Sequence, residues 1–238
     1  MMLVADAATP LLYQFGTCPH SKTVRSVLAY KRVPYRREEV PLFGRTALRR
    51  ASQQEWPPVL LHNGHVLVHV RSIVSYLEAT FPARPVVPAD AQLRAECFLL
   101  AHWIEKALHY LIAAVKFLNP ANRTVAVASV RRNYPAGHSH WLASLLPVGQ
   151  RFRLARFGYR VSQLPAIERA FSDCCVALDT RLEGRRFLVG DTVSCADMGL
   201  YAAFWTLQGC AEEAVICSLP NLAAWRERIA QERDWVEA

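Results

Sequence analysis

One cysteine stands where its side chain could do chemistry. In the stretch FGTCPHSKTVRSVLAY (15–30), Cys18 is followed by a proline and then by a pattern typical of a helix with one apolar face. Proline is favoured as the first residue of a helix, which would make Cys18 the N-cap. The unpaired amides and positive dipole of a helix start can lower the pKa of a thiol and give a nucleophilic thiolate. The alternative is a small buried side chain filling a turn.

His20 is the first candidate for assisting that thiol. It could act as a base or, as an imidazolium, stabilise the thiolate; the alternative is an exposed residue at a helix start. His65 and His69 would point to the same side of a regular strand, but no third metal ligand accompanies them. Because the cysteines form neither a CxxC motif nor the Cys/His spacing of a zinc site, we expect no metal.

The other cysteines and the apolar segments bear on location. An odd count of seven cysteines at irregular spacing does not suggest a disulfide framework, so we interpret the six besides Cys18 as core or incidental residues. The N-terminal MMLVADAATP lacks the basic start and apolar core of a secretory signal. Polar residues interrupt the most apolar segment, FLLAHWIEKALHYLIAAVKFL (98–118). We therefore expect a cytoplasmic protein with no membrane span.

The chain is basic, with a formal net charge of +8 over 238 residues. The densest basic stretch, RFRLARFGYR (151–160), interleaves four arginines (Arg151 to Arg160) with three aromatic residues. Arginines beside aromatic rings suit stacked bases or an acidic partner. The alternative, which we favour, is an amphipathic element whose aromatic rings pack inward while its arginines face water. No recognised nucleic-acid motif accompanies the stretch, so we expect no specific nucleic-acid partner.

The elements that would position Cys18 alternate in type over the first 80 residues. LLYQF (11–15) predicts a buried strand, and VPYRREEV (33–40) predicts a second strand parallel to it across the intervening helix. PPVLLHNGHVLVH (57–69) predicts a hairpin, because Asn-Gly separates two β-rich runs. RSIVSYLEATF (71–81) then predicts a helix. The order is βαβ, a connector, then ββα.

Helical patterns follow a proline-rich break. FPARPVVPAD (81–90) opposes both helix and sheet, which suggests domains at 1–82 and 90–238 joined by a linker at 83–89. Helices are expected over 90–118, 164–183 and 220–229, and the stretch 133–149 is expected to be partly irregular.

A helix start is also predicted near residue 194. Ser194 and Asp197 match an S-x-x-D capping box, and Val193 with Met198 would form a hydrophobic staple across it. We interpret Ser194 and Asp197 as folding residues rather than catalytic ones.

This organisation, together with three motifs, resembles the cytosolic glutathione transferase superfamily. The motifs are the C-P-x-S turn from Cys18 to Ser21, the Pro57-Pro58-Val59-Leu60 run before the hairpin, and the G-D-x-x-S-x-A-D stretch from Gly190 to Asp197. The resemblance implies a fold of α/β plus all-α class, with a thioredoxin-like N-terminal domain followed by a helical C-terminal domain. It also implies that Pro58 is in cis beside the glutathione cysteinyl backbone.

The resemblance implies partners as well. Glutathione would be the co-substrate, a homodimer would be usual, and an electrophilic or disulfide co-substrate would lie against the helical domain. We place that second pocket near His102, Trp103, Tyr110 and the 133–149 stretch.

Cysteine at the first helix start is similar to the omega-type transferases and to the chloride intracellular channel family, which carry glutaredoxin-like turns. A serine or tyrosine there would donate to the glutathione thiolate and favour conjugation, whereas a cysteine favours mixed disulfides. Because Ser21 replaces a second cysteine, glutathione itself would have to resolve the mixed disulfide. The resemblance thus implies thiol transfer or reduction through Cys18, with conjugation as a close variant.

The match is incomplete where glutathione should be held. His69-Val70 replaces the family's acid-serine pair, and Arg71 is the next candidate for binding a carboxylate. Pro57 has no N–H to offer glutathione, a loss of about 1 kcal/mol. The predicted binding residues are Pro57, Pro58, Val59, His69, Val70 and Arg71. Weak or altered glutathione binding follows, and a non-catalytic binding or scaffold protein on this fold is the alternative function.

Overall fold

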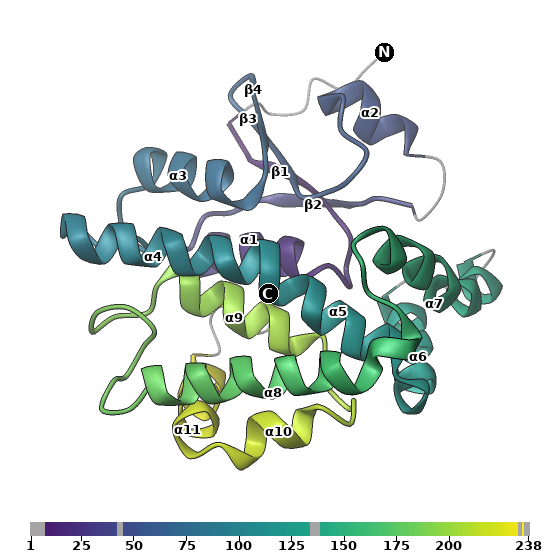
Figure 1. The fold of residues 1–238 in the computed structure, drawn as a ribbon. Coiled ribbons are helices and arrows are strands. Elements are labelled where there is room, and N and C mark those ends of the chain that lie inside the picture. The colour runs from purple at the N-terminus through teal and green to yellow at the C-terminus, as the bar shows by residue number, and fades with distance from the viewer. Residues whose placement is uncertain (1–7, 42–44, 134–138, 233–234, 236–238) are drawn as a thin grey trace. The chain divides into compact units, whose positions relative to one another are not determined.

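The computed structural model describes residues 8–41, 45–133, 139–232 and 235, with the side chains of 132–133 and 139–146 excluded (Figure 1). The chain divides into two compact units between Val87 and Pro88. Of the described residues near the C-terminus, Glu232 and Trp235 group with the first unit, whereas the sequence suggested one helical domain over 90–238.

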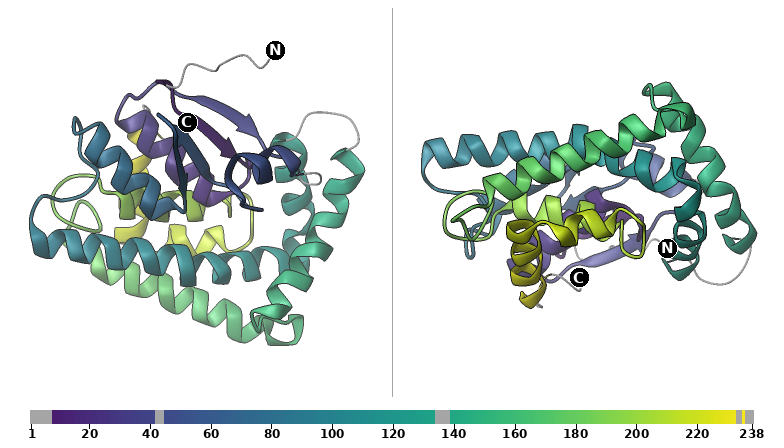
Figure 2. Two further views of the ribbon diagram at one scale, coloured as in Figure 1. Left: turned by 90° about the horizontal axis from the view of Figure 1, so that it is seen from above. Right: turned by 60° about the horizontal axis from the view of Figure 1, so that its bottom comes forward.

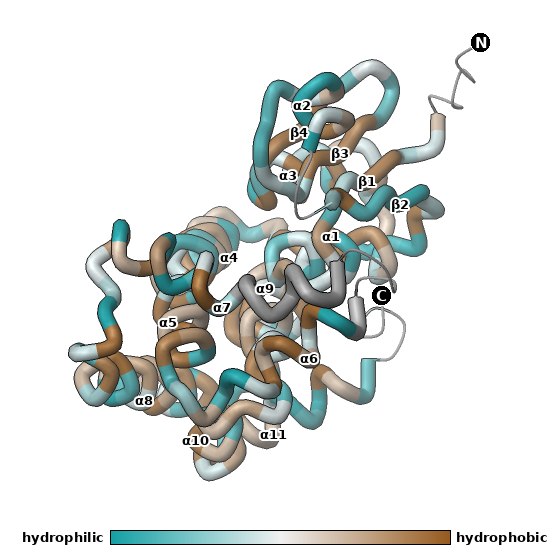
Figure 3. The backbone as a smooth tube through the Cα atoms, turned by 90° about the vertical axis from the view of Figure 1, so that its right-hand side faces the viewer, coloured by the Kyte–Doolittle hydropathy of each residue, from teal (hydrophilic) through white to brown (hydrophobic). Residues whose placement is uncertain are grey.

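Among the described residues of the first unit, four strands form one sheet in the order β2-β1-β3-β4. β2 pairs parallel with β1, and the β3–β4 hairpin pairs antiparallel through β3. The outer strand β2 is hydrophilic along its length (Figure 3). β3, in contrast, is largely buried. The strands are β1 (Leu11–Gln14), β2 (Arg36–Glu39), β3 (Val59–His62) and β4 (His65–Val68).

The turn between β3 and β4 confirms the predicted hairpin. Asn63 and Gly64 have φ values of 49° and 77°, which place both in the left-handed region. A two-residue turn of this kind matches the twist of antiparallel strands, and asparagine and glycine tolerate the conformation best.

The described part of the first unit also contains three helices: α1 (Pro19–Tyr30), α2 (Thr46–Ser52) and α3 (Val70–Thr80). α1 and α3 pack side by side (Figure 1). The apolar side chains that the pattern predicted on one face of each helix are buried. They are Val24, Val27 and Leu28 in α1, and Ile73, Val74 and Leu77 in α3. Burying such side chains stabilises the unit by about 1.5–3 kcal/mol each.

The second unit is helical throughout its described elements. They are α4 (Ala91–Trp103), the π-helical η1 (Ile104–Leu108), α5 (His109–Leu118), η2 (Pro120–Asn122), α6 (Arg123–Asn133), α7 (Ser139–Arg156), η3 (Val161–Gln163), α8 (Leu164–Arg181), α9 (Cys195–Trp205), α10 (Glu213–Ser218) and α11 (Pro220–Gln231). α5 packs against α8, α4 against α9, and α6 against α7, and Figure 2 shows α8 beside α5. The predicted thioredoxin-like half followed by a helical half is confirmed.

The continuous run Ala91–Leu118 is long and apolar enough, by length and composition, to cross a membrane. The sequence analysis expected no such segment. A core helix meets the same criterion, and here the run packs against α8 and α9 and buries Ile112 and Val115. One such run is weak evidence for a membrane span, and 33% of its apolar window is buried inside the structure.

One prediction for the helical half is wrong, and another is only partly covered by the described residues. Residues 139–149 belong to α7, which contains Pro147 inside the helix, whereas residues 134–138 lie outside the described residues; that the 133–149 stretch is partly irregular therefore stays a prediction. In the basic stretch the aromatic rings do not all pack inward. Phe152 is 73% exposed and Phe157 is 55% exposed, while Leu154 is the buried residue. The helix turns Leu154 inward, so Phe152, two positions before it, points outward. Phe157 lies in the turn that follows the end of α7 at Arg156.

Candidate functional site

One edge of the sheet gathers most of the residues that the sequence singled out. Val59, the first residue of β3, pairs with Tyr13 near the end of β1 and with Val68 at the end of β4. Because β3 runs opposite to both neighbours, its start lies at the same edge as their ends. The turn to Cys18, the proline pair before Val59 and the His69 junction after β4 therefore meet at one edge of the first unit.

Cys18 is the N-cap residue of α1. Its backbone is extended (φ −84°, ψ 122°), its carbonyl accepts from the Lys22 amide at 2.9 Å, and Pro19 follows as the first helical residue, as predicted. The Cys18 amide donates to the Phe15 carbonyl at 3.0 Å, which closes the turn out of β1. The Cys18 sulfur makes no capping hydrogen bond to the described residues of the first turn. The side chain is half-buried.

Local interactions favour the thiolate form of Cys18. Burial raises the pKa of the thiol, but a hydrogen bond and the charge of His20, together with the amide and hydroxyl of Ser21, outweigh burial and lower the pKa below its usual value. Ser21 is fully buried, and its hydroxyl also accepts weakly from the Phe15 amide at 3.4 Å. A thiolate at a helix start is the form that attacks disulfides.

A polar network supports the turn before Cys18, and the sequence analysis missed it. A Glu39 carboxylate oxygen accepts from the Gly16 amide at 2.5 Å, and the other accepts from the Gln14 amide group at 3.1 Å. Arg25, buried in α1, donates to Gln14 at 2.8 Å. The parallel pairing of β1 with β2 places Glu39 opposite Gln14 and so creates this network. Because Glu39 ends the second predicted strand, pairing the two predicted strands in the sequence could have indicated this contact.

The proline pair lies directly before β3. The Pro57–Pro58 bond is cis, and both prolines and Val59 are buried. Pro57 occupies the position whose N–H the family resemblance assigns to glutathione, and proline has none. Because Pro57 has no N–H, the site beside Pro58 and Val59 has one backbone hydrogen-bond donor fewer.

His69, Val70 and Arg71 form the junction from β4 into α3. His69 is the N-cap of α3, with φ 66° and an exposed side chain that makes no capping hydrogen bond to a described residue. Val70 is half-buried and Arg71 is exposed in the first turn. Valine supplies no side-chain donor, so recognition of a carboxylate here would depend on Arg71 and on backbone amides.

A second feature that the sequence analysis missed is a stack beside the proline pair. The Arg45 guanidinium carbon lies 3.7 Å from the centroid of the Trp56 ring and 5.7 Å from that of Phe15. Trp56, directly before Pro57, is 53% exposed. No motif marked Arg45 and Trp56 in the sequence, because an exposed tryptophan and an arginine in an Arg-rich segment have no distinctive spacing.

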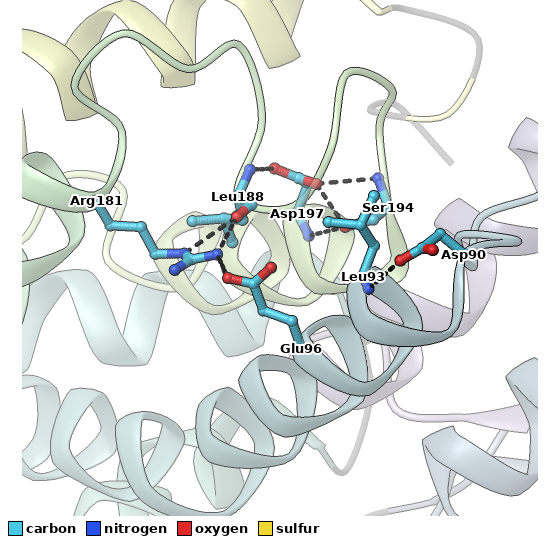
Figure 4. Close-up of polar contacts among 7 residues, drawn as sticks. All are labelled: Asp90, Leu93, Glu96, Arg181, Leu188, Ser194 and Asp197. Carbon is cyan, nitrogen blue, oxygen red and sulfur yellow. Dashed lines mark hydrogen bonds and ion pairs between the residues drawn. The ribbon is translucent and has the colours of Figure 1, made fainter.

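The structure supports a folding role for Ser194 and Asp197 (Figure 4). The Ser194 hydroxyl accepts from the Asp197 amide at 3.5 Å, and Asp197 accepts from the Ser194 amide at 3.0 Å. Asp197 also accepts from the Leu188 amide and the Trp225 indole N–H, both at 2.9 Å. The Ser194 hydroxyl donates to the same carboxylate at 2.7 Å. Burial raises the pKa of the Asp197 carboxyl, and the four hydrogen bonds that the carboxylate accepts, from Leu188, Trp225 and the amide and hydroxyl of Ser194, act in the opposite direction. Every oxygen of this carboxylate is used inside the fold.

The predicted co-substrate residues lie in the helical unit. His102 is exposed, and Trp103 and Tyr110 are half-buried on the α4–η1–α5 run. Tyr110 stacks on Phe157 with ring centroids 4.6 Å apart. Part of the 133–149 stretch lies outside the described residues. Within the described chain, no group of three His, Cys, Asp or Glu side chains is arranged to hold a metal ion.

Comparison with known proteins matches both halves of the chain. Residues 12–85 match the model for the glutathione S-transferase N-terminal domain, and residues 161–228 match the model for the C-terminal domain. The chain is 24% identical, over 194 residues, to probable maleylacetoacetate isomerase 2 of Drosophila melanogaster; the match covers 79% of this chain and 70% of that protein. In three further curated relatives the match spans 41%, 45% and 50% of the relative's length.

Two solved structures show the same fold. The beta-etherase LigF from Sphingobium sp. strain SYK-6 has a TM-score of 0.72 at 21% identity, covering 97% of this chain and 100% of that one. Rice GST1, solved in complex with glutathione, has a TM-score of 0.65 at 21% identity, covering 95% and 90%. With both domain models matched in order along one chain, this protein belongs to the cytosolic glutathione S-transferase superfamily.

Proposed function

We propose that this chain is a glutathione-dependent enzyme that transfers or reduces thiols through Cys18. The supporting observation is Cys18 at the start of α1, where His20 and Ser21 lower the pKa of its thiol despite burial. Membership of the family, and its relative crystallised with glutathione, support glutathione as the co-substrate. Similarity to the omega-type transferases remains a prediction from the same cysteine.

The proposed reaction has two exchange steps. The Cys18 thiolate attacks the glutathione sulfur of a glutathionylated substrate, the substrate thiolate leaves, and Cys18 then holds glutathione as a mixed disulfide. A second glutathione thiolate attacks that glutathione sulfur, which releases glutathione disulfide and returns the Cys18 thiolate. Ser21 cannot act as an internal resolving thiol, so each turnover consumes two glutathione molecules when the substrate is a simple disulfide.

Each nearby residue has a proposed role in these steps. His20 stabilises the thiolate and donates a proton to the departing thiolate. Pro58, Val59 and Arg71 are the proposed contacts of glutathione, with Pro57, His69 and Val70 lining the same edge of the sheet. Glu39 holds the turn before Cys18 through the Gly16 amide.

The test is reduction of bis(2-hydroxyethyl) disulfide by glutathione, followed through coupled glutathione reductase. We expect Cys18→Ala to lose at least about a thousandfold in rate, since it removes the nucleophile. Cys217→Ala, which removes an exposed cysteine of the helical unit, is the matched control and should leave the rate unchanged. Equal rates for wild type and Cys18→Ala would refute the proposal.

The same variants separate thiol transfer from conjugation. A serine hydroxyl can donate to the glutathione thiolate, so Cys18→Ser should lose disulfide reduction while retaining or gaining conjugation to an aryl halide electrophile. Isomerisation of maleylacetoacetate, the activity named for the fruit-fly relative, belongs in the same panel. The variant profile then identifies the reaction class.

A non-catalytic binding or scaffold protein is the second candidate, and specific residues favour it. Pro57 lacks an N–H and Val70 lacks a side-chain donor at the edge proposed to hold glutathione. Calorimetry with glutathione distinguishes the two candidates. A dissociation constant tighter than about 1 mM, roughly −4 kcal/mol, would count heavily against this second candidate. A homodimer and a cytoplasmic location remain predictions from the family resemblance.

A further inference from the structure

The helical unit holds two cysteines whose sulfur atoms lie close together. Cys97 in α4 and Cys195, the first residue of α9, are 98 positions apart in the chain, yet their Sγ atoms are 3.5 Å apart. Both residues are buried, at 0% and 5% exposure. The contact arises because α4 packs on α9, and it belongs to the unit that does not contain Cys18.

We propose that Cys97 and Cys195 are a redox-active pair that hydrogen peroxide converts to an intramolecular disulfide. The Cys97 thiolate attacks one peroxide oxygen, the O–O bond breaks, and the departing hydroxide takes a proton to become water. This step leaves Cys97 as a sulfenic acid. The Cys195 sulfur then attacks the Cys97 sulfur, its S–O bond breaks, and the hydroxide leaves as water with the Cys195 proton. Two thiols and one peroxide give one disulfide and two waters.

The surroundings distinguish the attacking thiol. A hydrogen bond with Cys195 lowers the pKa of Cys97; burial opposes this, and the Ala196 amide and the Ser194 hydroxyl add to the lowering. The negative charge of Asp197 opposes it more weakly. The Ala196 amide belongs to the first turn of α9, so the second helix start that favours a thiolate in this chain acts on a cysteine from another helix.

A polar chain holds the two helices at this spacing (Figure 4). Glu96, next to Cys97, forms an ion pair with Arg181, whose Nε donates to the Leu188 carbonyl at 3.1 Å. The Leu188 amide donates to Asp197 at 2.9 Å, and Asp197 caps α9 beside Cys195. Since both neighbours are anchored, the sulfur atoms need to approach each other only from 3.5 Å to the disulfide length of about 2.05 Å.

Burial selects the class of oxidant. Exchange with a glutathione disulfide requires a bulky partner to reach the sulfur, whereas hydrogen peroxide is little larger than water. Cys18 is half-buried and so less enclosed than the buried pair, which is suited to a small peroxide.

The chain supplies a matched comparison in α8. Cys174 and Cys175 are adjacent in sequence, and burial, with the neighbouring Cys174 as a smaller cause, raises the pKa of Cys175 to about 12. Cys174 also has a raised pKa, from burial and the charge of Asp173. These thiols lack the stabilised thiolate of Cys97, so they should stay reduced under conditions that oxidise the α4–α9 pair.

The test is peptide mapping of the full chain treated with hydrogen peroxide, blocked with N-ethylmaleimide in denaturant and digested without reductant. We expect a cross-linked peptide joining Cys97 to Cys195, lighter by two hydrogen atoms than its reduced parts and abolished by dithiothreitol. Oxidation should also raise the thermal midpoint by several degrees, because a disulfide over this loop constrains the unfolded chain.

Variants make the assignment specific. Cys97→Ala should abolish the cross-link and the rise in the thermal midpoint, whereas Cys174→Ala should retain both. The wild-type map does not depend on the folding of any variant. Recovery of Cys97 and Cys195 as maleimide adducts, or of Cys97 as a sulfinic acid, at peroxide concentrations that oxidise Cys18 would overturn the proposal.

Discussion

Among the described helices, α1 and α9 each begin beside a cysteine, and their first turns are stabilised in opposite ways. At α1 the N-cap is Cys18 itself; its sulfur makes no hydrogen bond of capping geometry to the described first turn, although the nearby Ser21 amide helps to lower the pKa of the thiol. At α9 the N-cap is Ser194, which forms a reciprocal capping box with Asp197. Unsatisfied amides attract a thiolate or a bound anion, whereas satisfied amides contribute to folding stability. The residue type at the N-cap therefore distinguishes α1, whose first turn is available for chemistry, from α9, whose first turn is used for folding stability.

The largest expected effect is on the free energy of unfolding, from a substitution at the start of α9. Asp197→Ala would leave the Leu188 amide, the Ser194 amide and the Trp225 indole N–H without their buried acceptor. We expect a loss of about 3–5 kcal/mol in the free energy of unfolding, measured by urea denaturation. The Cys18 alkylation rate of the folded fraction should stay unchanged. Should that rate change as much as the stability, the two helix starts would not be separable.

The second prediction concerns the pKa of Cys18 at the start of α1. His20→Ala removes the side chain that most lowers the pKa of Cys18, so the pKa should rise. The thiolate predominates above the pKa, so the pH midpoint of iodoacetamide alkylation should move upward. The rate below that midpoint should fall about tenfold for each pKa unit. A midpoint unaffected by His20→Ala would leave the helix start and Ser21 as the sole causes.

A smaller effect is expected from the cap hydroxyl of α9. Ser194→Ala removes the oxygen that accepts from the Asp197 amide, and should cost about 1 kcal/mol of unfolding free energy. Ser194→Thr keeps the hydroxyl and is the matched control. A neutral Ser194→Ala substitution would contradict the assigned capping role.

The smallest effect should have the opposite sign. Cys18 already has the extended backbone of an N-cap, and Cys18→Ser supplies the missing acceptor oxygen. We expect the unfolding free energy to rise by about 0.5–1 kcal/mol while disulfide reduction is lost. Chemical denaturation of the wild type and this variant at one pH makes the comparison. A loss of stability would mean that the first turn of α1 is satisfied by the thiol.

Local sequence signals were sufficient for much of the fold. The Asn63-Gly64 turn, the proline after Cys18 and the Ser194–Asp197 box act over a few residues, so their chemistry is visible without tertiary contacts. Amphipathic patterns in α1 and α3 likewise identified the buried faces. The family models confirm the order of the two halves.

The hydrophobic pattern of the sequence was not sufficient to predict contacts that depend on how several elements pack together. The exposed ring of Phe152 could not be foreseen, because the inward face of α7 is chosen by its packing partners, and Leu154 occupies that face. The stack of Arg45 on Trp56 likewise joins residues from separate segments. Contacts between separate segments produce no repeating pattern in the sequence, so they cannot be predicted from periodicity.

By itself, the sequence determined that Cys18 stands at a helix start, that Ser194 and Asp197 cap another, and that His69-Val70 and Pro57 depart from the family pattern. The tertiary structure alone decided that Glu39 holds the turn before Cys18, and that Cys97 meets Cys195 at 3.5 Å. The physical reason is range. Caps and turns are formed by residues within one turn of chain, whereas strand register and helix packing join residues that are 23 and 98 positions apart.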